Sequence, residues 1–266
     1  MNIAVAPFDL FSRGSGEALV LAGARMGGLM LVAPALSETV VPRMYRAMLV
    51  VILTLLLQPM ALSAMSTVPH ITGATLITET VIGFSIGLGA ALLIAAAETA
   101  GDVVAVQIGL SGSAILDPLS NENLPVLGTF MRLFAVTLLL SFNLHLQMLS
   151  ALADSFHALP LGQPVSLPGG MMAMLQLGGA LFAFGVRFAA PVIAAVLITN
   201  VALAVLGRAA PQLNILSVSF PIQIAVGLLT LIASLPAIAR FFGGWSGVYD
   251  GMLSVVARGF MAVAIR

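Results

Sequence analysis

The sequence predicts an all-α membrane protein. Of its 266 residues, 60% are hydrophobic and only 8% carry a charged side chain, whereas a soluble domain has about 25% charged residues. The mean hydropathy is +1.14, and about six or seven apolar segments approach the length of roughly 20 residues that a helix needs to cross a bilayer. Such a chain cannot cover a water-exposed surface, so these segments are expected to form hydrophobic helices and helical hairpins.

The first three apolar segments are joined by short connections. Residues 18–36 form the first expected span and carry Arg25 inside it. Residues 44–64 form the second, which has no charged residue after its first turn. Residues 72–97 form the third and contain Glu79.

The fourth apolar segment covers residues 124–153, with Arg132 near its start and His145 inside it. It is followed by a connection rich in Pro and Gly, residues 159–170, and such residues end helices. The segment is therefore expected to be one long helix that ends before this connection.

The last three apolar segments complete the chain. Residues 171–206 are too many for one simple span, and Arg187 and Pro191 interrupt them, so a kinked helix or a hairpin is expected. Residues 213–239 form another expected span. Residues 245–265 are less hydrophobic and amphipathic.

The longest connection, residues 98–123, contains a segment of unusual composition. From Gly101 to Pro118 it is rich in Gly and Ser and ends in Asp117-Pro118. Gly costs about 1 kcal/mol relative to Ala in a helix, and a residue before Pro is pushed out of the helical region. We therefore expect irregular backbone here, which a membrane protein tolerates only inside protein or beside a wet cavity. This pattern favours a gate or a pore.

Ionisable residues that lie inside the apolar segments include Arg25, Glu79, Arg132 and Arg187. Each would cost roughly 2.5–3.5 kcal/mol at the centre of a bilayer, so we expect all four to face protein or water. A proton or ion path is one interpretation. Buried ion pairs, for instance Arg25 or Arg132 with Glu79, are favoured, because a transporter usually has a denser relay of acidic and His side chains.

Glycines recur at four-residue spacing, which lets helix backbones approach closely. These are Gly23 and Gly27, Gly83 and Gly87, and Gly243, Gly247 and Gly251. Packing against partner helices and packing within this chain both fit the pattern.

The residues that carry chemistry in enzymes are sparse. Asp154 and His157 share a helix face, and His145 lies nearby in the sequence, but no HExxH pattern or third strong ligand completes a metal site. No GxSxG motif marks a nucleophile, there is no Cys, and all ten basic residues are Arg, which excludes a P-loop lysine. We expect no catalytic site, metal or cofactor, and no nucleic-acid partner.

The distribution of arginine suggests an orientation. Arg240, Arg258 and Arg266 make the C-terminal part basic, whereas residues 98–122 are acidic and contain no Arg. By the positive-inside rule, the C-terminus is expected in the cytoplasm.

Several motifs occur in an order and spacing typical of one known family. They are Gln107-Ile108-Gly109 and Asp117-Pro118-Leu119-Ser120 within residues 101–120; Ser141-Phe142-Asn143-Leu144-His145; residues 154–162, Asp154 to Gly162; and residues 208–214, Arg208 to Asn214, followed by Phe220-Pro221. On these motifs the chain resembles the FliR family, flagellar biosynthetic membrane proteins of the type III secretion export gate. The resemblance covers most of residues 80–235.

The resemblance implies a function that composition alone does not. FliR-like proteins join FliP-like and FliQ-like membrane subunits in a channel for unfolded export substrates, in the bacterial inner membrane at the flagellar basal body. An FlhB-like switch protein is expected at the cytoplasmic entrance. The chain would resemble a FliP-type unit fused to a FliQ-type unit, forming one multi-pass export-gate domain over residues 1–266 in contact with membrane lipid.

The resemblance also implies two functional segments. The first is a pore plug that comprises Gln107, Ile108, Gly109, Leu110, Ser111, Gly112, Ser113, Asp117 and Pro118. The second is a set of subunit contacts, namely Arg208, Pro211, Gln212, Asn214 and Pro221. Small, flexible residues in the plug could yield to a passing chain, and its apolar side chains could exclude water.

Two other functions remain open from the sequence. The chain could be the equivalent subunit of a virulence injectisome, although its motifs are more similar to those of the flagellar proteins. It could also be a small-solute or ion transporter, which should move its solute without partner proteins.

Overall fold

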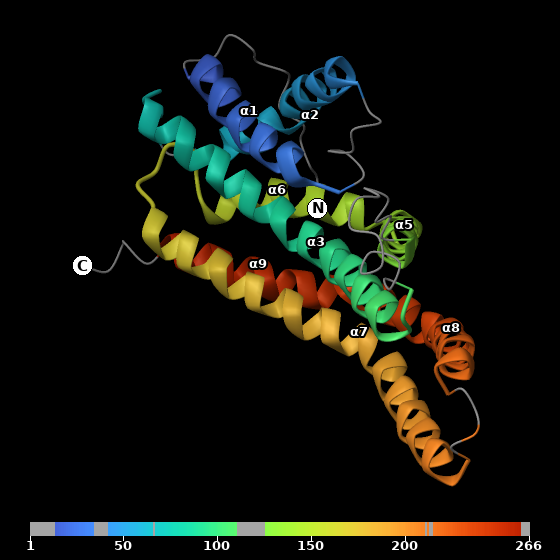
Figure 1. Ribbon diagram of the computed structural model, residues 1–266. Coiled ribbons are helices and arrows are strands. Elements are labelled where there is room, and N and C mark those ends of the chain that lie inside the picture. The colour runs from blue at the N-terminus through green and yellow to red at the C-terminus, as the bar shows by residue number, and fades with distance from the viewer. Residues whose placement is uncertain are drawn as a thin grey trace, which may run out of the picture. The chain divides into compact units, whose positions relative to one another are not determined.

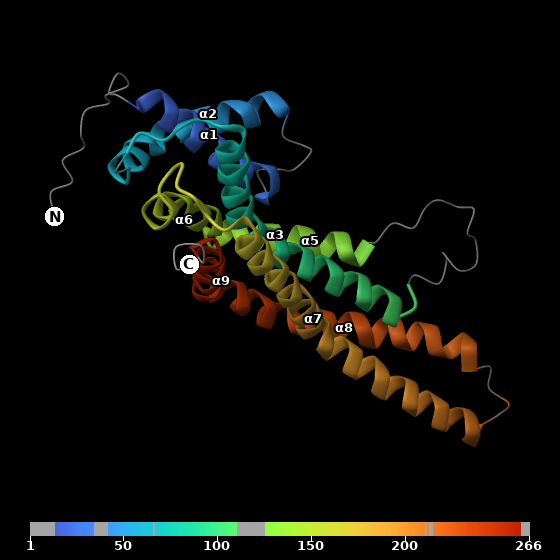
Figure 2. The same cartoon turned by 90° about the vertical axis from the view of Figure 1, so that its left-hand side faces the viewer.

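A computed structural model describes residues 14–34, 42–65, 67–110, 126–210, 212 and 215–261. Every regular element in these ranges is an α-helix (Figures 1 and 2), which confirms the predicted all-α class. The helices are α1 (Ser15–Val32), α2 (Arg43–Ser63), α3 (Gly73–Gln107), α5 (Val126–Ser141), α6 (Leu144–Ala158), α7 (Leu167–Ala209), α8 (Ile215–Gly243) and α9 (Trp245–Met261).

Five of these helices are long and apolar enough to cross a membrane: α1, α2, α3, α7 and α8. The pair α5 and α6 would provide a sixth crossing if it formed one broken span. Helix α9, with 17 residues, is shorter than the others that qualify. The described part of the chain therefore fits a multi-pass membrane protein, with five or six candidate spans by length and composition.

The chain forms two compact units. The first contains residues 1–92, 143–178 and 246–266, and the second contains residues 93–142 and 179–245. Helices α3 and α7 therefore contribute to both units.

Close packing between α1 and α3 shapes the first unit. A Cβ atom on Gly28 would clash with the carbonyl oxygen of Thr80, and one on Gly83 would clash with that of Arg25. The backbones of the two helices can touch only because these positions lack side chains. The predicted glycine pair at Gly83 and Gly87 therefore packs within the chain, and Gly28 was the partner that the four-residue spacing missed.

Helix α9, apart from its first residue Trp245, belongs to the same unit and packs through its aromatic residues. The Tyr249 hydroxyl donates a hydrogen bond of 2.8 Å to the carbonyl oxygen of Ile86, and its ring lies against Gly89. A Cβ atom on Gly170 would clash with the ring of Phe260, which is fully buried.

The second unit contains an aromatic cluster formed by α7, α8 and the first residue of α9. Its members are Phe184, Phe188, Phe241, Phe242 and Trp245, and neighbouring ring centroids lie 5.2–6.4 Å apart. Farther along the same two helices, the Gln223 amide donates a hydrogen bond of 2.7 Å to Asn200 Oδ1.

The prediction that α3 ends near Ala97 and that irregular backbone begins at Gly101 is wrong. The helix continues through Gly101 and Asp102 to Gln107. Gly101 is tolerated because it lies against α5, where a Cβ atom would clash with the carbonyl oxygen of Leu127. Tertiary packing here outweighs the low helix propensity of Gly.

One further expectation about helices is wrong, and the structure decides between two alternatives for another. The expected helix over residues 124–153 is broken at Phe142 and Asn143, where Asn143 has a φ of 56° in the left-handed region that Asn tolerates better than most residues. Residues 171–206, by contrast, do not form a hairpin. They lie in one continuous 43-residue helix, α7, which contains Pro191.

Candidate functional site

The first four residues of the predicted plug form the C-terminal cap of α3. Gln107 is the last helical residue, and Gly109 has a φ of 82°. The Gly109 N–H donates to the carbonyl oxygen of Val106 (3.1 Å), and the Leu110 N–H donates to that of Ala105 (3.0 Å). These bonds and the left-handed Gly make a Schellman motif, which satisfies carbonyl groups at a helix end.

This cap is packed against α8. Ile108 is fully buried, and its Cγ2 atom occupies the space that a Cβ atom on Gly227 would need. A Cβ atom on Gly109 would lie 3.1 Å from the ring of Phe220. The structure therefore brings the start of the predicted plug against the Phe220-Pro221 motif, two segments that are more than 100 residues apart in the sequence.

The rest of the predicted plug lies outside the described residues: Ser111, Gly112, Ser113, Asp117 and Pro118. The segment they belong to leads from the cap at Leu110, which is 42% exposed, to the start of α5 at Val126. Packing within the second unit holds the helices on both sides of this segment. The end of α3 is held because Ile108 packs against Gly227 of α8, and the start of α5 is held because Leu127 packs against Gly101 of α3.

Three of the five predicted subunit-contact residues are described. Arg208 is exposed in the last turn of α7, where a cation is favoured by the helix dipole. Gln212 is exposed in the connection to α8, and Pro221 is exposed inside α8. Pro211 and Asn214 lie outside the described residues.

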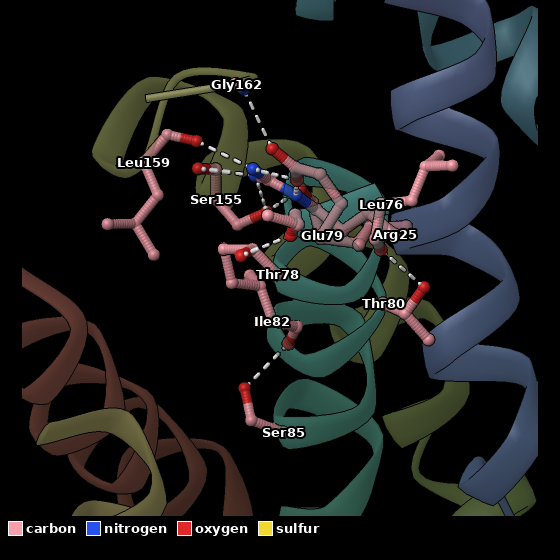
Figure 3. A network of polar contacts seen from close by, with 12 residues as sticks. Arg25, Leu76, Thr78, Glu79, Thr80, Ile82, Ser85, Ser155, Leu159 and Gly162 are labelled. Carbon is pink, nitrogen blue, oxygen red and sulfur yellow. Dashed lines mark hydrogen bonds and ion pairs between the residues drawn. The ribbon is translucent and has the colours of Figure 1, made fainter. Parts of the chain in front are cut away.

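A buried ion pair between Arg25 of α1 and Glu79 of α3 is the main polar feature of the first unit (Figure 3). Their side chains are 0% and 3% exposed. Arg25 Nη2 lies 2.6 Å and Nε 2.7 Å from Glu79 Oε2. This confirms one of the predicted buried pairs, that of Arg25 with Glu79.

The remaining guanidinium donors reach the end of α6. Arg25 Nη1 donates to the carbonyl oxygen and to the hydroxyl of Ser155, both at 3.0 Å. Nη2 also donates to the carbonyl oxygen of Leu159 at 2.9 Å. The five N–H groups of Arg25 therefore all have acceptors, which compensates its removal from water.

Glu79 and an aromatic ring complete the network. Glu79 Oε1 accepts a 2.9 Å hydrogen bond from the Gly162 N–H, in the turn after α6. The Arg25 guanidinium carbon lies 4.9 Å from the centre of the Phe156 ring, a favourable cation–π distance. One ion pair thus joins α1, α3, α6 and the turn at Gly162. The sequence signalled the two charges, but not the backbone carbonyls that bind Arg25.

The other two predicted intramembrane cations have different surroundings. Arg132 lies 4.0 Å from Glu98, not from Glu79, and their side chains are 42% and 36% exposed. Arg187 is exposed on α7.

The remaining candidates of the sequence do not converge. Within the described ranges, His145, Asp154 and His157 are not part of any group of three or more His or carboxylate side chains that could hold a metal ion. A Cβ atom placed on Gly27, Gly247 or Gly251 would have no heavy atom of a neighbouring segment within 4 Å, so these glycines have no close neighbour within the described part of the chain.

Comparison with known proteins identifies relatives of this chain. The family described as "Bacterial export proteins, family 1" matches residues 17–246. The flagellar biosynthetic protein FliR of Escherichia coli (strain K12) is 36% identical over 220 residues, which cover 82% of this chain and 84% of that protein. FliR of Pectobacterium carotovorum is 35% identical over 88% of this chain and 90% of its own length. FliR of Caulobacter vibrioides is 27% identical over 87% and 92%.

Proposed function

This chain belongs to the FliR family of bacterial export proteins, and we propose that it forms a channel for unfolded flagellar substrates together with FliP-like and FliQ-like subunits. Its role is in flagellar protein export, as a subunit of the export gate. The observation that carries this function is the match of 35–36% identity over 82–88% of the chain to flagellar FliR proteins. The channel is proposed to lie in the bacterial inner membrane, with an FlhB-like switch protein at its cytoplasmic entrance.

The plug of this channel is proposed to be the segment that follows the α3 cap. A plug needs fixed ends and a pliable middle, so that it can yield without releasing its helices. Fixed ends are supported by two contacts: Ile108 packs against α8, and Leu127 packs against Gly101 of α3. Ser111, Gly112 and Ser113 provide a middle with small side chains.

The connection between α7 and α8 is proposed to bind neighbouring subunits through three polar residues, here named the turn set: Arg208, Gln212 and Asn214. The exposure of Arg208 and Gln212 supports this, because both side chains are free to reach another chain. The proposal gives the protein no catalytic role, since the family is one of export components.

The first test is a clean deletion of the gene in its host, scored by swimming motility and by secretion of hook and filament proteins. Both should be lost and then restored by the gene on a plasmid. A Gly16→Ala variant, altered at an exposed position where a Cβ atom would meet no neighbouring segment within 4 Å, should complement fully and serves as the expression control. Normal flagella in the deletion strain would refute the flagellar role.

A further inference from the structure

Arg187 is a cation on α7 for which neither α7 nor α8 has a counterion. No Asp or Glu occurs between Asp154 and Asp250, so no carboxylate lies on either helix. The acidic side chains that pair with arginine in the described ranges are Glu79, with Arg25, and Glu98, beside Arg132. Arg187 is exposed and forms no ion pair with any described residue.

Lipid cannot cover the whole of this helix. With 43 residues, α7 is about 65 Å long at roughly 1.5 Å per residue, about twice the roughly 30 Å thickness of the hydrocarbon core. Large apolar side chains are nevertheless exposed along nearly all of α7: Met172 is 61% and Val205 is 62% exposed, and these two residues are about 50 Å apart along the helix at roughly 1.5 Å per residue. Part of this apolar surface must therefore be covered by protein.

The surface around Arg187 suits a helix as its neighbour. Ala183, Ala190 and Ala194 lie four residues before, three after and seven after Arg187, which places all four on one helix face, and all are exposed. We refer to these four residues as the Arg187 face. The three alanine side chains of this face are small and let the backbone of another helix approach closely. The long Arg187 side chain would then contact the side chains of that helix.

We propose that the Arg187 face binds an apolar helix of another chain that carries an Asp or Glu, and that Arg187 forms a buried ion pair with this carboxylate. The inference rests on the proposed function in one respect only, that the protein works within a membrane assembly. An ion pair is required because a cation enclosed by an apolar helix is destabilising unless an opposite charge neutralises it.

The absence of Cys from the chain allows a direct test. A single cysteine at Ala190, on the Arg187 face, would carry a maleimide–benzophenone label in native membranes. Cysteine at Ala189, the adjacent residue, which is fully buried, is the matched control. The label at position 190 should capture an apolar helix with an Asp or Glu within one turn of the crosslink, and position 189 should give no such product.

Charge variants then test the ion pair itself. Arg187→Leu and Arg187→Asp should lower recovery of the captured chain about tenfold or more, as loss of one partner of a buried charge pair does, while Arg187→Lys should retain much of it. Replacing the captured carboxylate with Arg should restore recovery with Arg187→Asp.

Three results would overturn the inference. One is a label that reaches only lipid, together with normal assembly of Arg187→Leu, which would place Arg187 beside lipid headgroups. Another is a crosslink to residues 111–125 of the same chain, and the third is a captured helix without a carboxylate. The gene-deletion phenotype is independent of all three, so the proposed function can hold while this inference fails.

Discussion

Removal of the Glu79 carboxylate tests whether the buried ion pair holds the first unit together. In Glu79→Ala, Arg25 would remain fully buried with a charge that no carboxylate neutralises. The Gly162 N–H would also lose its acceptor. Loss of one partner of a buried pair costs about 3–5 kcal/mol, which for a protein of this size corresponds to a fall in Tm of roughly 6–20 °C.

The measurement is thermal unfolding of the purified protein in detergent, followed by loss of monodisperse protein. Glu98→Ala is the matched control, because it removes a carboxylate from a half-exposed pair with a separation of 4.0 Å. Pairs of that kind contribute about 0–1 kcal/mol, so the control should change Tm by no more than a few degrees. If both variants lowered Tm equally, the argument from burial would be refuted.

The double variant Arg25→Met/Glu79→Leu separates charge from hydrogen bonding. It removes both charges, but it leaves the carbonyl groups of Ser155 and Leu159 without the Arg25 donors. Each buried group left unsatisfied costs about 1–3 kcal/mol. The double variant should therefore be more stable than Glu79→Ala but less stable than the natural protein. Full recovery of Tm would show that the contacts to the end of α6 contribute nothing.

Helix packing and the proposed gate lead to three further predictions. Gly83→Ala should lower stability by about 1–3 kcal/mol in the same thermal assay, because the methyl group would clash with the backbone of α1; Gly27→Ala, with open space around it, should not. Deletion of residues 111–114 should make the closed gate conduct small ions, and unchanged conductance in cells would argue against a plug there. Alanine replacement of the turn set should reduce copurification of the gate subunits; an intact assembly that fails to export would contradict the contact role.

The class of the protein could be predicted from composition and periodicity. A chain with 8% charged residues and repeated apolar segments of about 20 residues has no soluble alternative, because its helices have too few polar side chains to face water. The pairing of Arg25 with Glu79 could also be predicted from the sequence, because isolated charges in apolar helices must be neutralised.

Helix boundaries were less predictable, because packing decided them. Gly101 and Asp102 indicate a break in isolation, yet α3 continues because Gly101 meets α5 at a contact with no room for a side chain. The break at Asn143 is the reverse case, since nothing in the apolar pattern marks a left-handed residue there. Local propensities of about 1 kcal/mol are smaller than the packing energies that oppose them.

The amino-acid sequence was sufficient for the membrane class, for the order of the apolar helices and for the motifs of the FliR family, because these depend on hydrophobicity and local order along the chain. Tertiary contacts determined which atoms meet. Three contacts join segments that are about 50 to 135 residues apart: Arg25 with its acceptors at the end of α6, Gly28 with α3, and Ile108 with α8. Such contacts leave no periodic signal in the sequence, because they depend on where the packed helices bring their backbones together.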